Sequence, residues 1–110
     1  MILSQGDIIK VNFNPQSGHE QAGFRPALVI SNAIFNKKTN LTIVCPISNT
    51  NNIFPLHIPL DSRTKTTGSV LCQHIKSLDL KARGFEYVEK IPDDIMTQVL
   101  DIIFAEIEPE

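Results

Sequence analysis

Residues 24–48 read FRPALVISNAIFNKKTNLTIVCPIS and hold two apolar runs, ALVIS at 27–31 and NLTIVCPIS at 40–48. Both runs are short and rich in β-branched residues, which predicts strands. ALVIS is continuously apolar, so we expect a buried strand, and NLTIVCPIS repeats the same style. The polar connection between them, NAIFNKKTN, has room for one helical turn.

The remaining strands are predicted on either side of this pair. DIIKVNF alternates loosely, FPLHIPL contains two prolines and is typical of an edge strand, and GSVLCQHIK allows a bulge or turn in its middle. FEYVEKI is the last predicted strand, and SLDLKARGF before it is irregular or a short helical turn. The four predicted strands occupy residues 7–13, 54–60, 68–76 and 85–91.

The C-terminal segment PDDIMTQVLDIIFAEIEPE changes to helical spacing, with apolar residues at 95, 96, 99, 100, 102, 103 and 107. Pro92 suits a helix start, and Asp93 and Asp94 suit its positive end. Short strands and one terminal helix predict a mainly β protein, a small and strongly curved barrel plugged by that helix. At 110 residues we expect a single domain over 1–110.

Composition is that of a globular chain, with 42% apolar and 20% charged residues. The N-terminus lacks a signal-peptide pattern and no apolar run is long enough to span a bilayer, which predicts a cytoplasmic protein with no membrane partner. Cys45 and Cys72 lie in apolar stretches with no ligand cluster beside them. They are interpreted as buried, reduced thiols, and neither a metal nor another cofactor is predicted.

The formal charge of −2 hides an asymmetry along the chain. Residues 1–85 hold nine Lys/Arg against four Asp/Glu, a net +5, whereas residues 86–110 hold one against eight, a net −7. The basic part is compatible with a polyanionic ligand, and equally with a mixed solvated surface. Each scattered cation is interpreted as solvated: Lys37, Lys38, Arg63, Lys65, Lys76, Lys81 and Arg83.

Residues 18–26, GHEQAGFRP, crowd polar groups between two glycines and a proline. Arg25 precedes Pro26, so its backbone is extended where the loop becomes a buried strand. A guanidinium fixed on the scaffold in this way suits a phosphate, because it donates two parallel hydrogen bonds. The alternative is a structural ion pair between Arg25 and Glu20.

Three other residues have both a chemical and an ordinary interpretation. His19 and Glu20 are adjacent, so in an extended segment they face opposite ways, and each is compatible with a role in loop structure alone. Ser48 ends a predicted strand and begins a polar run, which indicates a rim of hydrogen-bonding groups for a ligand or simply a turn.

The order of these motifs resembles the MazF/PemK family of toxin endoribonucleases. The resemblance rests on GDIIKVNFNP, GHEQAGFRPALVIS, VCPIS, TTGSVLCQHIKSLDLKARG and a final helix, and it runs from Gly6 to about Ile107. It implies a PemK/CcdB-like SH3-like barrel, a homodimer and metal-independent cleavage of single-stranded RNA to 2′,3′-cyclic phosphate and 5′-hydroxyl ends. It also implies a cognate antitoxin of the MazE/PemI kind.

The resemblance assigns catalytic roles to Arg25, which matches the family arginine, and to Ser48, which stands where the family has a threonine. His19 matches a loop histidine of the PemK branch, and our own hypothesis is that Glu20 or His19 activates the 2′-hydroxyl. The arginine and aspartate that the PemK branch carries on a later strand correspond to Leu71 and Gln73, so that pair is absent. RNA-binding residues are predicted at Gln21, Phe24, Asn49, Gln73, His74 and Lys76, with Phe24 stacking on a base.

Two rival functions share these features. A CcdB-like gyrase inhibitor has the same architecture but depends on a tryptophan-containing C-terminus, and this chain has no Trp. A non-catalytic RNA-binding relative is compatible with Ser48 and the missing arginine–aspartate pair.

Overall fold

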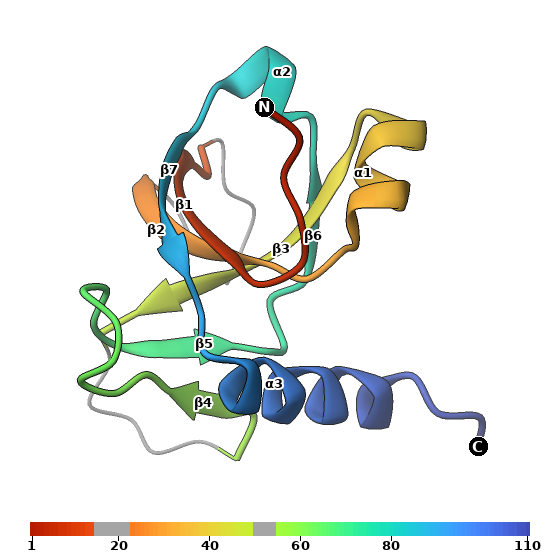
Figure 1. Ribbon diagram of the computed structural model, residues 1–110. Coiled ribbons are helices and arrows are strands. Elements are labelled where there is room, and N and C mark those ends of the chain that lie inside the picture. The colour runs from red at the N-terminus through yellow and green to blue at the C-terminus, as the bar shows by residue number, and fades with distance from the viewer. Residues whose placement is uncertain (15–22, 50–54) are drawn as a thin grey trace.

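The computed structural model describes residues 1–14, 23–49 and 55–110 (Figure 1). Seven strands and three helices follow one another along the described chain. Their bounds are β1 Asp7–Asn12, β2 Phe24–Val29, α1 Ala33–Thr39, β3 Thr42–Ser48, β4 His57–Pro59, β5 Ser69–Leu71, β6 Lys76–Leu78, α2 Leu80–Arg83, β7 Glu86–Lys90 and α3 Asp93–Glu106.

All the strands belong to one antiparallel sheet in the order β4-β5-β3-β2-β1-β7, and β6 also pairs with β3. The far edge of β3 is therefore shared, since Thr42–Val44 pair with β6 and Ile47–Ser48 pair with β5. The predicted strand 68–76 is thus two short strands with a turn between them, as its pattern allowed. A register shift at Ile8/Ile9 between β1 and β7 adds to the curvature that rolls the sheet up (Figure 1).

The central strands are apolar on both faces because each face has its own core. Ile8, Leu28 and Cys45 belong to one hydrophobic cluster, and their chain neighbours Ile9 and Val29 belong to another. Alternate side chains of a strand point to opposite faces, so ALVIS lies between two buried layers. The prediction of a buried strand is confirmed, although the strand already begins at Phe24.

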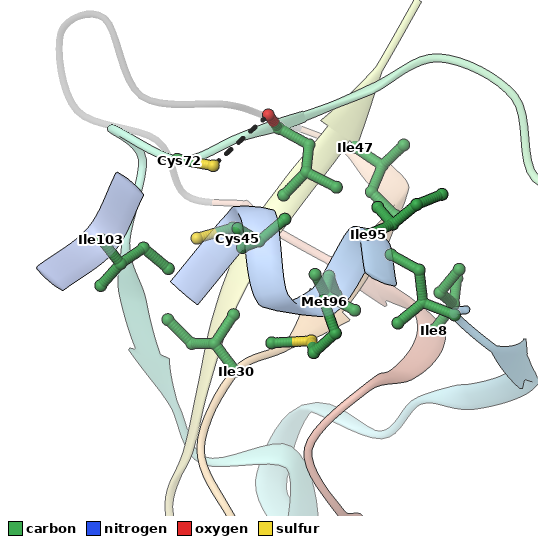
Figure 2. Close-up of a cluster of buried hydrophobic side chains, with 12 residues drawn as sticks. Ile8, Ile30, Cys45, Ile47, Cys72, Ile95, Met96 and Ile103 are labelled. Carbon is green, nitrogen blue, oxygen red and sulfur yellow. Dashed lines mark hydrogen bonds between the residues drawn. The ribbon is translucent and has the colours of Figure 1, made fainter. Parts of the chain in front are cut away.

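Helix α3 covers one of these cores. Its buried residues Ile95, Met96, Val99 and Ile103 pack with the cluster that contains Ile8 and Leu28 (Figure 2). The other cluster lies inside the curl of the sheet and is completed by residues of the α2 region, Leu80 and Phe85. The predicted helix is confirmed, but the prediction that it plugs the barrel is wrong: it covers the opposite face.

Helix α1 is longer than the single turn that the sequence predicted. The Asn32 side chain caps it by accepting a hydrogen bond from the Phe35 amide at 2.9 Å, and Asn40 ends it in a left-handed conformation. Asn36 turns inward and donates to the Leu3 carbonyl at 2.8 Å. The polar segment forms a helix because asparagine serves as its N-cap and as a link to the N-terminal segment.

Both cysteines are free and buried, as predicted. Figure 2 shows them among isoleucines under α3, with the Cys72 thiol donating to the Val70 carbonyl at 3.8 Å. Burial, together with the charge of Glu106, raises the pKa of Cys72 to about 12. Burial likewise raises the pKa of Cys45, with smaller effects from Cys72 and Glu106. These thiols are core residues.

No helix in the described part of the chain is long and apolar enough to cross a membrane.

Candidate active site

The register of the sheet brings Arg25 and Ser48 together. Strands β2 and β3 pair with Ala27 opposite Pro46 and Val29 opposite Val44. Continuing this antiparallel register by two residues sets Arg25 opposite Ser48, each near the end of its strand. Neighbouring strands lie about 5 Å apart, so the two side chains flank one small space.

This pair stands at the mouth of the barrel. Along β2, Arg25 shares a face with Ala27 and Val29, which are buried inside the curl. Arg25 is exposed and Ser48 is half-buried, so the inward-facing row of side chains changes from apolar to polar where it reaches solvent. A guanidinium and a hydroxyl at this position can both donate hydrogen bonds to a phosphate.

The two ends of the β1–β2 connection are held by main-chain and side-chain hydrogen bonds. The Phe13 amide donates to the Gly23 carbonyl at 2.8 Å, and the Gly23 amide donates to Asn14 Oδ1 at 3.0 Å. Gly23 has a φ of +81°, which favours glycine. The connection therefore leaves β1 and enters β2 at fixed points. The predicted site residues His19, Glu20 and Gln21 lie outside the described residues.

Arg83 adds a longer-range attachment to the same place. Its guanidinium nitrogen Nη1 donates to the Asn12 carbonyl at 2.9 Å and to the Asn14 carbonyl at 2.7 Å. Asp79 caps the short helix α2 that carries Arg83 by accepting from the Ala82 amide at 3.1 Å. The interpretation of Arg83 as a solvated cation is wrong. Its presence in the LDLKARG motif was the only signal in the sequence.

Gly68 brings β5 close to Ser48. A Cβ atom at this position would lie 2.6 Å from the Ser48 carbonyl oxygen, and the φ of Gly68 is +112°. Ser69 pairs with Ser48 in the sheet, and Asn49 Nδ2 donates to Thr67 Oγ1 at 3.2 Å. The position of the Ser48 main chain therefore depends on Gly68 having no side chain.

The remaining predicted RNA-binding residues fall into two groups. Phe24 and Asn49 adjoin the Arg25–Ser48 pair, and Phe24 is 58% exposed, as a base-stacking residue must be. Gln73, His74 and Lys76 follow β5 toward the other end of β3. Gln73 Nε2 lies 3.0 Å from His57 Nε2, and Lys76 pairs with Val44, which is about 13 Å along the strand from Ser48.

A second group of charges fixes the connection between β4 and β5. Arg63 forms hydrogen-bonded ion pairs with Asp61 and Asp94, each at 2.8 Å, which tie residues 61–63 to the first turn of α3. Hydrogen bonds from Arg63 lower the pKa of both carboxyl groups. The interpretation of Arg63 as a solvated cation is therefore also wrong. One of its two partners, Asp94, lies 31 residues away in the sequence.

No group of three or more His, Cys, Asp or Glu residues in the described ranges is arranged to hold a metal ion. Leu71, one of the two positions where the PemK branch has a charged residue, is buried. The chemical groups that the described structure brings together are thus an arginine, a serine hydroxyl and nearby amides.

The fold and the site define a small antiparallel β-barrel protein with an arginine and a serine hydroxyl at the ends of two neighbouring strands. Residues 4–105 match the model of the PemK-like, MazF-like toxins of type II toxin-antitoxin systems. The chain belongs to this family, and the resemblance expected from its motifs is confirmed.

Relatives and solved structures agree with this assignment. The chain is 37% identical to endoribonuclease PemK of Escherichia coli over 102 residues, which cover 89% of this chain and 77% of the relative. It is 37% identical to endoribonuclease toxin MazF of E. coli strain K12, covering 76% and 74% of the two chains. The crystal structure of MazF from Deinococcus radiodurans superposes with a TM-score of 0.91 at 34% identity, covering 96% of each chain.

Proposed function

We propose that this protein is the toxin of a toxin–antitoxin pair and cleaves single-stranded RNA, leaving 2′,3′-cyclic phosphate and 5′-hydroxyl ends. The observation that supports this proposal best is the β2–β3 register, which sets Arg25 opposite Ser48 when it is continued by two residues, in a chain whose relatives are named endoribonucleases. We propose that residues 1–110 form one toxin domain.

The reaction needs few protein groups because RNA supplies its own nucleophile. The 2′-hydroxyl oxygen attacks the adjacent phosphorus, a P–O bond forms, and the bond to the 5′-oxygen of the next nucleotide breaks. Charge builds up on the phosphoryl oxygens as this happens. A metal-activated water is not required by this chemistry, so the proposed reaction is independent of metal ions.

Arg25 is proposed to bind the phosphoryl oxygens and to stabilise their developing charge. Its planar guanidinium can donate two hydrogen bonds to one phosphate, and its exposed position at the barrel mouth leaves room for a polynucleotide. Ser48 is proposed to donate a further hydrogen bond to the same phosphate from the opposite strand. Serine retains the hydroxyl that the family threonine carries and lacks only its methyl group.

Proton transfer is proposed to involve the β1–β2 connection. Glu20 or His19 takes the proton of the 2′-hydroxyl, and the leaving 5′-oxygen receives a proton from solvent water, a transfer that Arg25 assists. Phe24 stacks on an unpaired base, and Gln21, Asn49, Gln73, His74 and Lys76 contact bases or backbone along the strand. DNA should resist cleavage because it lacks the 2′-hydroxyl.

The proposed partners are a second copy of this chain and an acidic antitoxin. Phe104 and Ile107, near the end of α3, are 55% and 71% exposed, and burial of such residues in a homodimer would remove apolar surface from water. Solved structures similar to this chain include a MazE–MazF complex from D. radiodurans. We expect both proteins to act in the cytoplasm, where the RNA is.

Incubation of the purified protein with a long single-stranded RNA in EDTA, followed by analysis of the new ends, tests this function. We expect cuts at a few sites with cyclic phosphate ends, and a loss of at least about 100-fold in rate for Arg25→Ala, as for removal of a group that stabilises transition-state charge. Uncut RNA from the folded wild-type protein would contradict an endoribonuclease and favour a binding-only protein.

A further inference from the structure

A groove of about 360 Å³ lies beside the Arg25–Ser48 pair. Pro26 and Asn49, the residues that directly follow the pair in the chain, line it. Because successive side chains of a strand point to opposite faces, Pro26 faces away from the barrel mouth that Arg25 occupies. The groove therefore adjoins the candidate active site but lies on the opposite face of β2 and β3.

The lining of the groove combines two cations with hydroxyl, amide and apolar groups. The remaining lining residues are Lys10, Lys65, Thr66, Thr67 and Val88. Lys10 comes from β1 and Lys65 from the β4–β5 connection, and both are exposed. No ion pair joins either ammonium group to a residue of the described chain, although Glu86 stands opposite Lys10 in the β1–β7 register.

The wall that carries Lys65 is held in place by β7. The Glu89 carboxylate accepts hydrogen bonds from the Lys65 amide at 3.0 Å, the Thr66 amide at 2.8 Å and the Thr66 hydroxyl at 2.8 Å. Partial burial opposes the charged form of Glu89, but these donors and the Lys65 ammonium outweigh it and keep the pKa of this carboxyl below its usual value.

The same wall is joined to the candidate active site on its other side. Thr67 accepts the hydrogen bond from Asn49, and Gly68 lies against the Ser48 carbonyl. Anchored at Glu89 and at Ser48, the segment 65–68 has little freedom to collapse into the groove. A volume near 360 Å³ is within the range of small-molecule sites.

We propose that this groove binds the nucleotide next to the cleaved phosphate, with the phosphate of that nucleotide between Lys10 and Lys65 and its sugar or base against Pro26 and Val88. The inference rests on the proposed function, because it extends the RNA path from the Arg25–Ser48 pair around the strand ends. Two ammonium groups suit a phosphate, and the amide of Asn49 and the threonine hydroxyls can read base edges or a 2′-hydroxyl.

The test is the salt dependence of RNA binding. The probe is a short RNA spanning one mapped cleavage site, made uncleavable by a single 2′-deoxy substitution at the cut. The dissociation constant is measured for the wild-type protein, Lys10→Ala and Lys65→Ala between about 50 and 200 mM salt. Lys38→Ala on α1 is the matched control, because Lys38 is exposed and lies outside the groove.

We expect each groove variant to bind about fivefold more weakly at low salt, the upper end for an exposed ion pair. Each should also make the negative slope of the logarithm of the association constant against the logarithm of the salt concentration less steep by about 0.7. This is the value for one phosphate contact with a single strand. Lys38→Ala should change neither quantity. Thermal unfolding of both groove variants should be unaltered, because both side chains are exposed, and Lys10→Arg should restore the slope.

The outcomes separate this inference from the proposed function. A wild-type protein that cuts RNA, with groove variants whose affinity and salt slope are unchanged, would overturn the inference alone. Weakened binding of polyglutamate by the groove variants with unchanged RNA binding would also overturn it, and would assign the groove to an acidic peptide. A wild-type protein that neither cuts nor binds RNA would overturn both.

Discussion

Strands β2 and β3 pass through two different surroundings within a few residues. At Leu28 and Cys45 they are buried under α3. Two residues beyond the register pair Ala27–Pro46 they carry Arg25, which is exposed, and Ser48, which is half-buried. The buried half depends on apolar packing and the open half on hydrogen-bonding groups. One rigid strand pair therefore supplies both the stability of the fold and the spacing of the candidate site.

The largest effect is expected in the buried half. Leu28 is fully buried, so Leu28→Ala removes apolar contacts and leaves a cavity, and should lower the free energy of unfolding by about 3 kcal/mol. Chemical denaturation measures this loss. If the two halves are separable, the RNA cleavage rate per folded molecule at low temperature should stay close to that of the wild type. A cleavage rate per folded molecule that falls together with the free energy of unfolding would show that the buried and open halves are coupled.

Gly68→Ala should affect both halves together. The added methyl group would lie 2.6 Å from the Ser48 carbonyl oxygen, and alanine is strained at a φ of +112°. We expect a destabilisation of about 2 kcal/mol and, unlike Leu28→Ala, a fall in cleavage rate that persists in the folded fraction. Ser69→Ala, at the next residue, is the control. Equal rates for Gly68→Ala and the wild type would contradict the placement of Ser48 in the site.

Arg83→Ala should reduce cleavage without a large change in stability. The variant loses the hydrogen bonds that hold the carbonyl groups of Asn12 and Asn14, so the end of β1 beside Arg25 is less well fixed. A misplaced catalytic group can cost up to about 100-fold, and we expect about tenfold here, mainly in kcat. Lys81→Ala, on the same helix and exposed, controls for charge. Identical kinetics for both variants would assign Arg83 to the surface.

The smallest effect concerns pH. The pKa of Glu89 is below its ordinary value of 4.5 in the folded protein, so its contribution to stability is complete above that value and is lost as the pH falls through the folded pKa. Thermal unfolding measured from neutral to acidic pH should therefore lose less stability for Glu89→Gln than for the wild type below about pH 4.5. If the stability of Glu89→Gln and that of the wild type fall equally with decreasing pH, the charge of Glu89 does not contribute to stability.

Much of the architecture could be predicted from the sequence because its signals are local. The apolar runs at 27–31 and 40–48 and the periodicity of α3 depend only on neighbouring residues. Helix α1 was underestimated, since its asparagine cap and the inward turn of Asn36 are strong only in the context of the fold. The edge strand predicted over 54–60 is shorter, His57–Pro59, because only its central part pairs with β5.

The site was harder to predict because its contacts are distant in sequence. Arg83 reaches carbonyl groups 69 and 71 residues away, and no periodicity reports such a contact. Motif order did identify Arg25 and Ser48, but only the β2–β3 register, continued by two residues beyond Ala27 and Pro46, sets them opposite each other. The roles of His19, Glu20 and Gln21 remain predictions from the motif alone.

Arg25 and Ser48 are proposed to act on the same phosphate. A double-mutant cycle tests it, with kcat/KM for RNA cleavage measured for Arg25→Ala, Ser48→Ala and the variant that carries both changes. Residues that act as a unit are not additive, so the double variant should be hardly slower than Arg25→Ala alone. A double variant whose loss equals the product of the two single losses would contradict a shared phosphate.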